Sequence, residues 1–185
     1  KAITIDLGFD GVSFDKIADY CDRLGIEYII NKTDIAKILF ETRKEKNPCS
    51  LCAKLRKGAL NNAAKSAGCN KVALGHHLDD VIETFFLSLF YESRLFCFSP
   101  VTYLDKADIT IIRPLIYVAE SIIEGYVKKT ALPVLHNPCV ADGNTKRAYI
   151  KKTISFLENS DKSLKQKIFN AVKSGILDKK YFKTP

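Results

Sequence analysis

Three of the six cysteines are spaced so that their thiols could hold a metal centre. Cys49 and Cys52 form a C-x-x-C motif, whose spacing lets two thiolates reach one zinc or iron–sulfur site, and Cys139 follows an Asn-Pro pair far along the chain. A closed zinc site would take a fourth ligand, for which His136 and Asp142 are nearby candidates. A three-cysteine [4Fe–4S] cluster would instead leave one iron open to a small sulfur species. Taken alone, the C-x-x-C is also compatible with a redox pair.

The other cysteines and the start of the chain bear on whether disulfide bonds are expected. Cys21, Cys69 and Cys97 stand in helical or apolar patterns that are typical of small buried hydrophobic residues. The first residues carry one lysine and a short apolar run broken by Asp6, which is not typical of a secretion signal. Disulfide bonds are therefore not expected. No apolar run reaches the ~18 residues of a membrane-spanning helix, so no membrane partner is expected.

A second group of reactive side chains follows an apolar run at residues 72–74. The sequence Gly75-His76-His77-Leu78-Asp79-Asp80 stands where a buried strand turns into a helix. The free N–H groups and positive dipole of such a helix end suit phosphate, imidazoles can contact phosphate oxygens, and paired carboxylates can hold Mg²⁺. The structural alternative is that Asp79 or Asp80 caps the helix and that the histidines are satisfied locally.

The positive charge of the chain is confined to one end. Residues 144–185 contain eleven Lys and Arg residues against three acidic ones, a net charge of +8, whereas residues 1–143 contain eighteen of each. A neutral body with a basic end predicts contact with a polyanion such as nucleic acid. The alternative is a helical face exposed to solvent.

Four basic residues are candidates for contacts with RNA or phosphate: Arg56, Arg113, Lys146 and Arg147. Arg56 follows the C-x-x-C, Arg113 ends an apolar strand, and the other two begin the basic end of the chain. Near a phosphate or RNA site they would neutralise charge.

The hydrophobic periodicity predicts alternating strands and helices. Strands are expected over residues 2–7, 26–30, 71–75 and 109–112, with a further short strand at 132–135. Helices are expected over residues 14–24, 33–40, 50–67, 78–90, 119–129, 145–157 and 163–174, with a polar loop over 41–48.

This alternation predicts an α/β fold, a mostly parallel sheet with helices on both faces, followed by basic helices. Ligands of such sheets bind beyond the carboxyl ends of the strands. The expected division is an α/β domain over residues 1–143 and a basic helical segment over residues 144–185, which we expect to contact RNA.

Four stretches together resemble the tRNA 2-thiocytidine synthetase family of PP-loop ATPases, within the adenine nucleotide α-hydrolase-like fold. They are residues 49–58 (CSLCAKLRKG), 71–80 (KVALGHHLDD), 112–115 (IRPL) and 138–139 (PC). The resemblance runs from about residue 2 to about residue 150, in matching order and spacing.

The resemblance implies an ATP- and Mg²⁺-dependent enzyme that adenylates the C2 oxygen of a tRNA cytidine, after which sulfur displaces AMP. It also implies that Cys49, Cys52 and Cys139 ligate a [4Fe–4S] cluster, with zinc as the alternative occupant. The family's His-His-x-Asp-Asp motif, near nucleotide and metal, matches the sequence from His76 to Asp80. Expected partners are tRNA and a sulfur donor, either a cysteine desulfurase or sulfide, in a cytoplasmic protein that could form a homodimer.

The sequence departs from the family pattern in two places. The Ser-Gly-Gly-x-Asp-Ser loop that holds the ATP phosphates is absent, since the sequence opens at the family's second strand, and weak ATP binding is expected of this chain alone. The second C-x-x-C of the family keeps only Cys139, because Asp142 stands at its other end. The alternatives are another PP-loop enzyme, acting on a different base or making lysidine, and a zinc-stabilised RNA-binding protein without catalysis.

Overall fold

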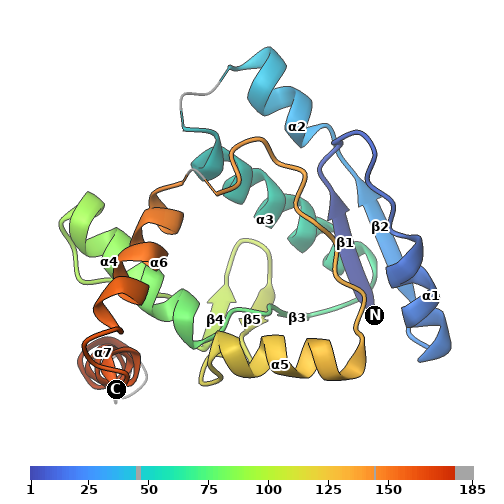
Figure 1. Cartoon of the computed structure of the whole chain (residues 1–185). Helices are drawn as coiled ribbons and strands as arrows, with labels where there is room; N and C mark the ends of the chain where they lie inside the picture. The colour runs from blue at the N-terminus through green and yellow to red at the C-terminus, as the bar shows by residue number, and fades with distance from the viewer. Residues whose placement is uncertain (45–46, 144, 178–185) are drawn as a thin grey trace. The chain divides into compact units, whose positions relative to one another are not determined.

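The computed structural model describes residues 1–44, 47–143 and 145–177 (Figure 1). Its contacts divide the chain into two compact units. The first comprises Lys1–Val72, Leu104–Ile109 and Ala131–Asp142, and the second comprises Ala73–Tyr103, Thr110–Thr130 and Gly143–Pro185. Residues 144 and 178–185 of the predicted basic segment lie outside the described residues.

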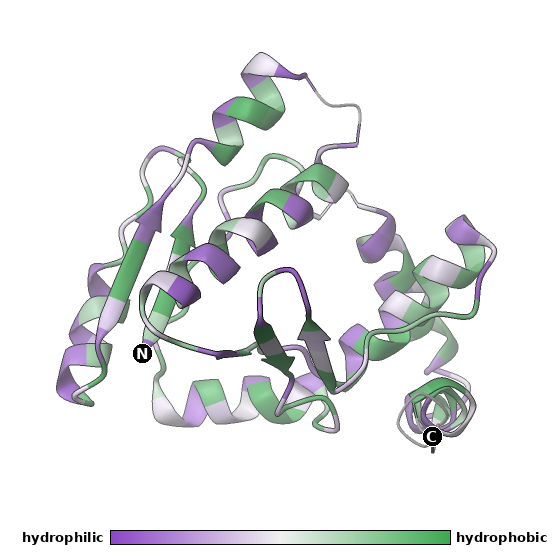
Figure 2. Ribbon diagram, turned by 180° about the vertical axis from the view of Figure 1, so that it is seen from behind, coloured by the Kyte–Doolittle hydropathy of each residue, from purple (hydrophilic) through white to green (hydrophobic). Residues whose placement is uncertain are grey.

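The first unit opens with a parallel β–α–β arrangement. β1 (Ala2–Asp6) and β2 (Tyr28–Lys32) pair in parallel, with the first residue of each strand opposite the first of the other. α1 (Asp15–Arg23) connects them, because parallel neighbours need a crossover that returns the chain to the same end of the sheet. Each strand has isoleucines, at positions 3 and 5 of β1 and at the neighbouring positions 29 and 30 of β2, which appear green in Figure 2.

Two further helical segments complete the regular structure of the first unit. α2 (Ile35–Lys37) continues directly into the π-helix η1 (Ile38–Thr42), and α3 (Pro48–Ser66) follows. Proline suits the first position of α3 because the missing N–H would have had no partner there. The chain leaves α3 at Gly68, whose positive φ of 74° is available to glycine at little cost.

The chain enters the second unit within β3 (Lys71–Ala73), which belongs to a three-stranded sheet of order β3-β5-β4. β4 (Val101–Leu104) and β5 (Ile109–Ile112) are joined by four residues, a connection short enough only for antiparallel neighbours. β5 matches its predicted bounds. β4 was not predicted, because its four residues alternate between exposed and half-buried and contain no apolar run.

Helices form most of the second unit: α4 (Leu78–Glu92), α5 (Glu120–Thr130), α6 (Lys146–Leu157), α7 (Leu164–Val172) and the π-helix η2 (Lys173–Leu177). α6 and α7 both pack on α4. Their shared core consists of apolar residues from α4, the loops beside it and the three C-terminal helical segments: Leu78, Val81, Ile82, Cys97, Ile116, Ile150, Ile154, Phe169, Val172 and Leu177. The basic end of the chain is therefore part of a hydrophobic core.

The α/β class and the parallel pairing are confirmed, and the predicted helices are all present within a few residues of their expected ends. The described strands form two sheets, of two and three strands, where one mostly parallel sheet was expected. The strand predicted at 132–135 is wrong, since that segment has no regular structure. Cys21 and Cys97 are buried as predicted, whereas Cys69 is half-buried. Within the described part of the chain, no helix has both the length and the apolar character to span a bilayer.

Candidate functional site

The C-x-x-C motif lies at the start of α3. Pro48 is the first residue of the helix, so Cys49 and Cys52 lie in its first turns and, being three apart, on one side of it. Both thiols are free; that of Cys49 is exposed and that of Cys52 half-buried. Asn47 precedes the helix without a side-chain capping hydrogen bond, which leaves the positive end of the helix near the thiols open.

Cys139 lies in the same unit, on the segment 131–142. Its N–H donates to Asn137 Oδ1 at 3.2 Å, and its carbonyl accepts from the Asp142 N–H at 2.9 Å, so a tight turn holds this cysteine. The thiol is free and half-buried. The local order comes from Asn137, whose side chain bonds the backbone two residues on, as asparagine commonly does in turns.

The three thiols are electrostatic neighbours. Burial raises the pKa of the Cys52 thiol; Arg56 opposes this effect, and Cys139 and Cys49 add to it. Cys139 thus influences the Cys52 thiol electrostatically, although 87 positions separate the two in the sequence. Within residues 1–44, 47–143 and 145–177, no three His, Cys, Asp or Glu side chains are arranged as a formed metal site.

A cavity of about 180 Å³ adjoins the carboxyl end of β1 in the same unit. Its walls come from β1, the loop after it and the segment before Cys139: Ile5, Asp6, Leu7, Phe9, Val12, Phe14, Leu135, His136, Asn137 and Pro138. His136, a predicted fourth ligand, thus lines this cavity, and Asp142 is exposed. The sequence offered one signal for the cavity, the rule that ligands bind beyond the carboxyl ends of parallel strands.

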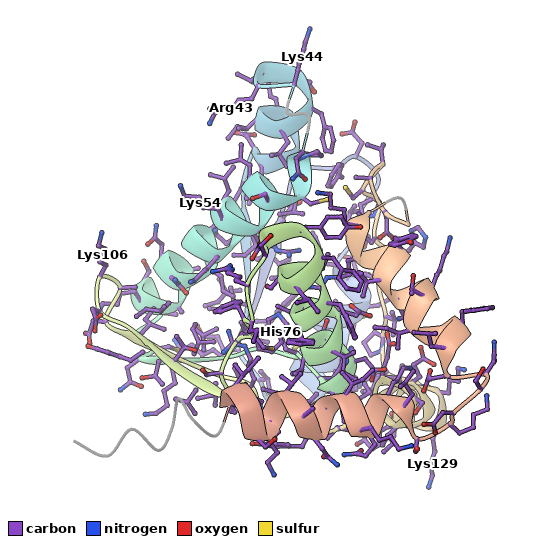
Figure 3. The ribbon with its side chains drawn as sticks, turned by 90° about the vertical axis from the view of Figure 1, so that its left-hand side faces the viewer. Arg43, Lys44, Lys54, His76, Lys106 and Lys129 are labelled. Atoms are coloured by element: carbon purple, nitrogen blue, oxygen red, sulfur yellow. The ribbon has the colours of Figure 1, made fainter. Side chains whose placement is uncertain are left out.

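The predicted strand–helix junction is found in the second unit, between β3 and α4. Figure 3 shows His76 at the foot of α4. Its ring packs against Phe98 with centroids 4.8 Å apart. Burial lowers the pKa of His76, and the positive charges of Arg113 and Arg147 lower it further against the opposing effect of Asp80. These effects favour the neutral form of the His76 imidazole.

Two polar atoms at this junction are buried without a hydrogen-bond partner among the described residues: Nδ1 of His76 and Nδ1 of His77. Such atoms are uncommon in proteins, because burying an unpaired polar group is costly. Gly75, directly before them, is exposed, and nothing lies within 4 Å of the place where a Cβ would stand. The junction thus combines unpaired imidazole nitrogens with open space beside the backbone.

The two carboxylates after the histidines cap helices, as the structural alternative predicted. Asp80 Oδ2 accepts from the His77 N–H at 3.0 Å, at the start of α4. Asp79 Oδ2 accepts from the Glu120 N–H at 2.7 Å, at the start of α5. Both bonds satisfy N–H groups that have no partner within their own helix.

Cations from the basic end of the chain neutralise these carboxylates. Lys165 Nζ lies 2.9 Å from Asp79 Oδ1 and 3.0 Å from Glu158. Burial alone would raise the pKa of Asp79, but the Glu120 N–H and Lys165 more than offset it, so its pKa lies below the usual value. Asp79 is 5% exposed, and its charge is stable there only because of these partners.

Arg147 pairs with acidic residues of α4. Its Nη1 lies 2.8 Å from Glu83 Oε2 and 3.4 Å from Asp80 Oδ1, and its Nη2 donates to Thr84 Oγ1 at 3.2 Å. Burial raises the pKa of Glu83 even though Arg147 opposes it. The guanidinium predicted to contact RNA is thus paired with residues of α4, although its side chain is exposed.

The remaining predicted basic residues have different surroundings. Arg113 stacks over Phe98 at 4.8 Å and donates to the Ser99 carbonyl at 2.6 Å. Lys146 Nζ lies 4.2 Å from the ring centroid of Tyr91. Arg56, in the first unit, is exposed beside the cysteine group.

Sequence reasoning missed Glu83, Glu120 and Lys165. Glu83 is three residues after Asp80 and so lies on the same side of α4, a local signal that was available. The partners of Glu120 and Lys165 depend on how α5 and α7 pack, which no local pattern reveals.

Comparison with known proteins gives one consistent picture. The profile of the PP-loop domain family matches residues 12–157. The tRNA-cytidine(32) 2-sulfurtransferase of Geobacter sulfurreducens is 36% identical over 174 residues, which cover 92% of this chain and 68% of that protein. Its counterpart from Ralstonia nicotianae is 34% identical over 94% of this chain and 56% of that protein. The chain thus spans between about half and two thirds of these relatives.

Among solved structures, the U34-tRNA thiolase NcsA from Methanococcus maripaludis, solved with its [4Fe-4S] cluster, has a TM-score of 0.74. The match covers 94% of this chain and 60% of that one at 22% sequence identity, so it shows that the two share a fold.

Proposed function

The chain belongs to the PP-loop domain family and, within it, to the tRNA-cytidine(32) 2-sulfurtransferases, and from this premise we propose that it serves ATP-dependent transfer of sulfur to C2 of a tRNA cytidine. The base oxygen would attack the α-phosphorus of ATP and release pyrophosphate. Sulfur would then form a bond to C2, and AMP would leave with the oxygen. Activation is needed because an unactivated oxygen is a poor leaving group.

One observation supports the proposal: three free thiols belong to the first unit, those of Cys49 and Cys52 at the start of α3 and that of Cys139 on the turn after Asn137. Three thiols are the donor set that a [4Fe–4S] cluster with one open iron requires, and these residues would hold it. When bound, the cluster would supply an iron to which sulfur can attach. The thiols would lose their protons on binding, which Arg56 favours by its charge.

The junction in the second unit would serve the nucleotide. Nδ1 of His76 is buried without a hydrogen-bond partner among the described residues, and α4 begins beside it with its positive end. The ring of His77 lies 3.4 Å from Asp80 and 3.9 Å from Asp79. We assign Asp79 and Asp80 a positioning role, because their oxygens bond the helix ends and cations described above. Mg²⁺ would accompany the ATP phosphates, as it commonly does in nucleotide sites.

Nucleoside analysis tests the proposal. Deleting the gene should remove 2-thiocytidine from cellular tRNA, and the wild-type gene should restore it, whereas a Cys139→Ser gene should not. Mass spectrometry of digested tRNA measures each case. Normal 2-thiocytidine in the deletion strain would refute the proposal, and loss of another modified base would assign the protein to a different PP-loop reaction. Anaerobically purified protein should contain iron and sulfide; one zinc in their place would favour RNA binding without catalysis.

A further inference from the structure

The helix α6 presents three kinds of surface. Ile150 and Ile154 are buried in the core of the second unit. Arg147 and Lys151 form ion pairs, with Glu83 at 2.8 Å and with Glu120 at 2.7 Å. The residues on the remaining side follow one another at intervals of three or four positions, which places them along one side of a helix: Lys146, Tyr149, Lys152 and Phe156. We refer to these four residues as the Tyr149 face.

The Tyr149 face exposes large aromatic rings. Tyr149 is 60% exposed and Phe156 is 72% exposed. At one end of the face, Lys146 lies over the ring of Tyr91 on α4, and the neighbouring Phe90 is also exposed. The Tyr149 face thus exposes two large rings of its own and borders a third, Tyr91, at its Lys146 end, whereas isolated exposed hydrophobic residues are ordinary.

The charge of this surface restricts what can cover it. The sequence of α6, KRAYIKKTISFL, contains no acidic residue. Lys146 and Lys152 are exposed, and neither forms an ion pair with another residue that the structure describes. A second copy of the same face would bring these cations against each other. A polyanion with planar rings, by contrast, would match both the lysines and the aromatics.

We infer that the Tyr149 face binds unpaired bases of the tRNA, an inference that rests on the proposed function and extends it. Tyr149 and Phe156 stack on bases, and Lys146 and Lys152 contact the phosphates between them. The two aromatics are seven residues apart, or about 10 Å along the helix axis, so they receive separate bases. Duplex RNA offers no such bases, because its rings are stacked inside the helix.

Substitution of the aromatics tests the inference in the full-length protein. Tyr149→Ala and Phe156→Ala should each weaken tRNA binding by about five- to a hundredfold, the expected worth of one stacked base. Tyr126→Ala is the matched control, since Tyr126 on α5 is 61% exposed. Filter binding gives the Kd, and melting temperatures should be unchanged because the removed rings are exposed. Wild-type affinity in both variants would overturn the inference.

Salt dependence separates the lysines from the aromatics. Lys152→Gln should reduce the slope of log Kd against log salt by about 0.7–0.9, the contribution of one phosphate contact, while Tyr149→Ala should leave the slope unchanged. Lys129→Gln is the control, because Lys129 extends from α5 into solvent (Figure 3). Equal slopes for wild type and Lys152→Gln would contradict the phosphate contact.

Two further outcomes keep this inference distinct from the proposed function. If Tyr149→Ala changes the sedimentation of the protein but not its affinity for tRNA, the face joins two copies and the inference is wrong. If both variants bind tRNA normally while 2-thiocytidine depends on the gene, the inference fails and the proposed function stands. If wild-type protein neither binds tRNA nor supports the modification, both fail.

Discussion

The cysteine group of the first unit and the strand–helix junction of the second differ in how far their reactive side chains are already satisfied. The thiols of Cys49, Cys52 and Cys139 are all free. That of Cys49 is exposed, and those of Cys52 and Cys139 are half-buried. At the junction, Asp79 and Asp80 each bond a helix end and a cation. Reactive side chains in one region are therefore available to a ligand, and those in the other are largely used by the protein itself.

This difference shows that residue type alone does not separate ligand sites from scaffolding. A buried carboxylate must find positive partners wherever it lies, and the fold supplies them from its basic end. Part of the charge that suggested RNA contact, that of Arg147 and Lys165, is used in this way. What remains for a ligand at the junction is chiefly Nδ1 of His76, since the ring of His77 lies beside Asp79 and Asp80.

The largest expected effect is at the cysteine group. Cys139→Ser should abolish the charge-transfer absorbance of anaerobically purified protein, because the remaining thiols cannot complete the three-cysteine donor set. Its melting temperature before metal loading should equal that of wild type, because the bonds that hold residue 139 in its turn are made by its backbone, which serine keeps. Cys69→Ser, a half-buried cysteine outside the group, should keep the absorbance. Retained absorbance in Cys139→Ser would place the site elsewhere.

At the junction, the largest effect should be on stability. Lys165→Met leaves Asp79 buried without its cation and should lower the free energy of unfolding by about 2–3 kcal/mol near neutral pH. Urea denaturation measures it.

The pH dependence of this loss follows from the pKa of Asp79. In wild type, the lowered pKa of Asp79 stabilises the fold at pH values above the usual pKa of an aspartate. This contribution is lost as the pH falls through the pKa of Asp79 in the folded protein. Without Lys165, burial raises the pKa of Asp79. The variant therefore loses the unpaired buried charge by protonation at a higher pH than that at which wild type takes up the proton. The gap between the two proteins should narrow from about pH 7 to about pH 4. A gap that does not change with pH would mean that Lys165 acts by packing.

A smaller effect is expected from the helix caps. Asp80→Ala removes the acceptor of the His77 N–H and should cost ~1 kcal/mol. Thr145→Ala removes a similar bond, from the Ala148 N–H at 3.1 Å, at the start of α6 and should cost about the same. Only Asp80→Ala should also reduce thiolation of tRNA by the full-length enzyme, because it alone releases the backbone beside His76. Equal activity in the two variants would deny the junction a role in the reaction.

The smallest effect should come from Lys167→Met. Its partner Asp161 lies 2.7 Å away, and hydrogen bonds from Lys167 and Ser163 lower the pKa of that acid to about 2. The pair is in solvent, where screening and side-chain entropy leave little net stabilisation. Urea denaturation should therefore show no measurable difference from wild type, in contrast to Lys165→Met on the same helix.

Much of this could be predicted from the sequence because the relevant signals are local. Helix bounds follow from periodicity, glycine and proline, as in α3 between Pro48 and Gly68. The C-x-x-C and the motif from Gly75 to Asp80 were visible as spacings. β4 and the irregular structure of residues 132–135 could not be predicted, because both segments are too short for a reliable pattern. Whether residues 101–104 form a strand depends on their pairing with β5.

Residue types and their order along the chain determined the alternation of strands and helices, the family resemblance and the three candidate thiols. Only the tertiary structure decided which charges meet. Lys165 and Asp79 are far apart in sequence, and their pairing depends on α7 packing against α4. The physical reason is that the fate of a charge depends on burial and on neighbours within a few ångströms, and both are set by the packing of elements that no local pattern specifies.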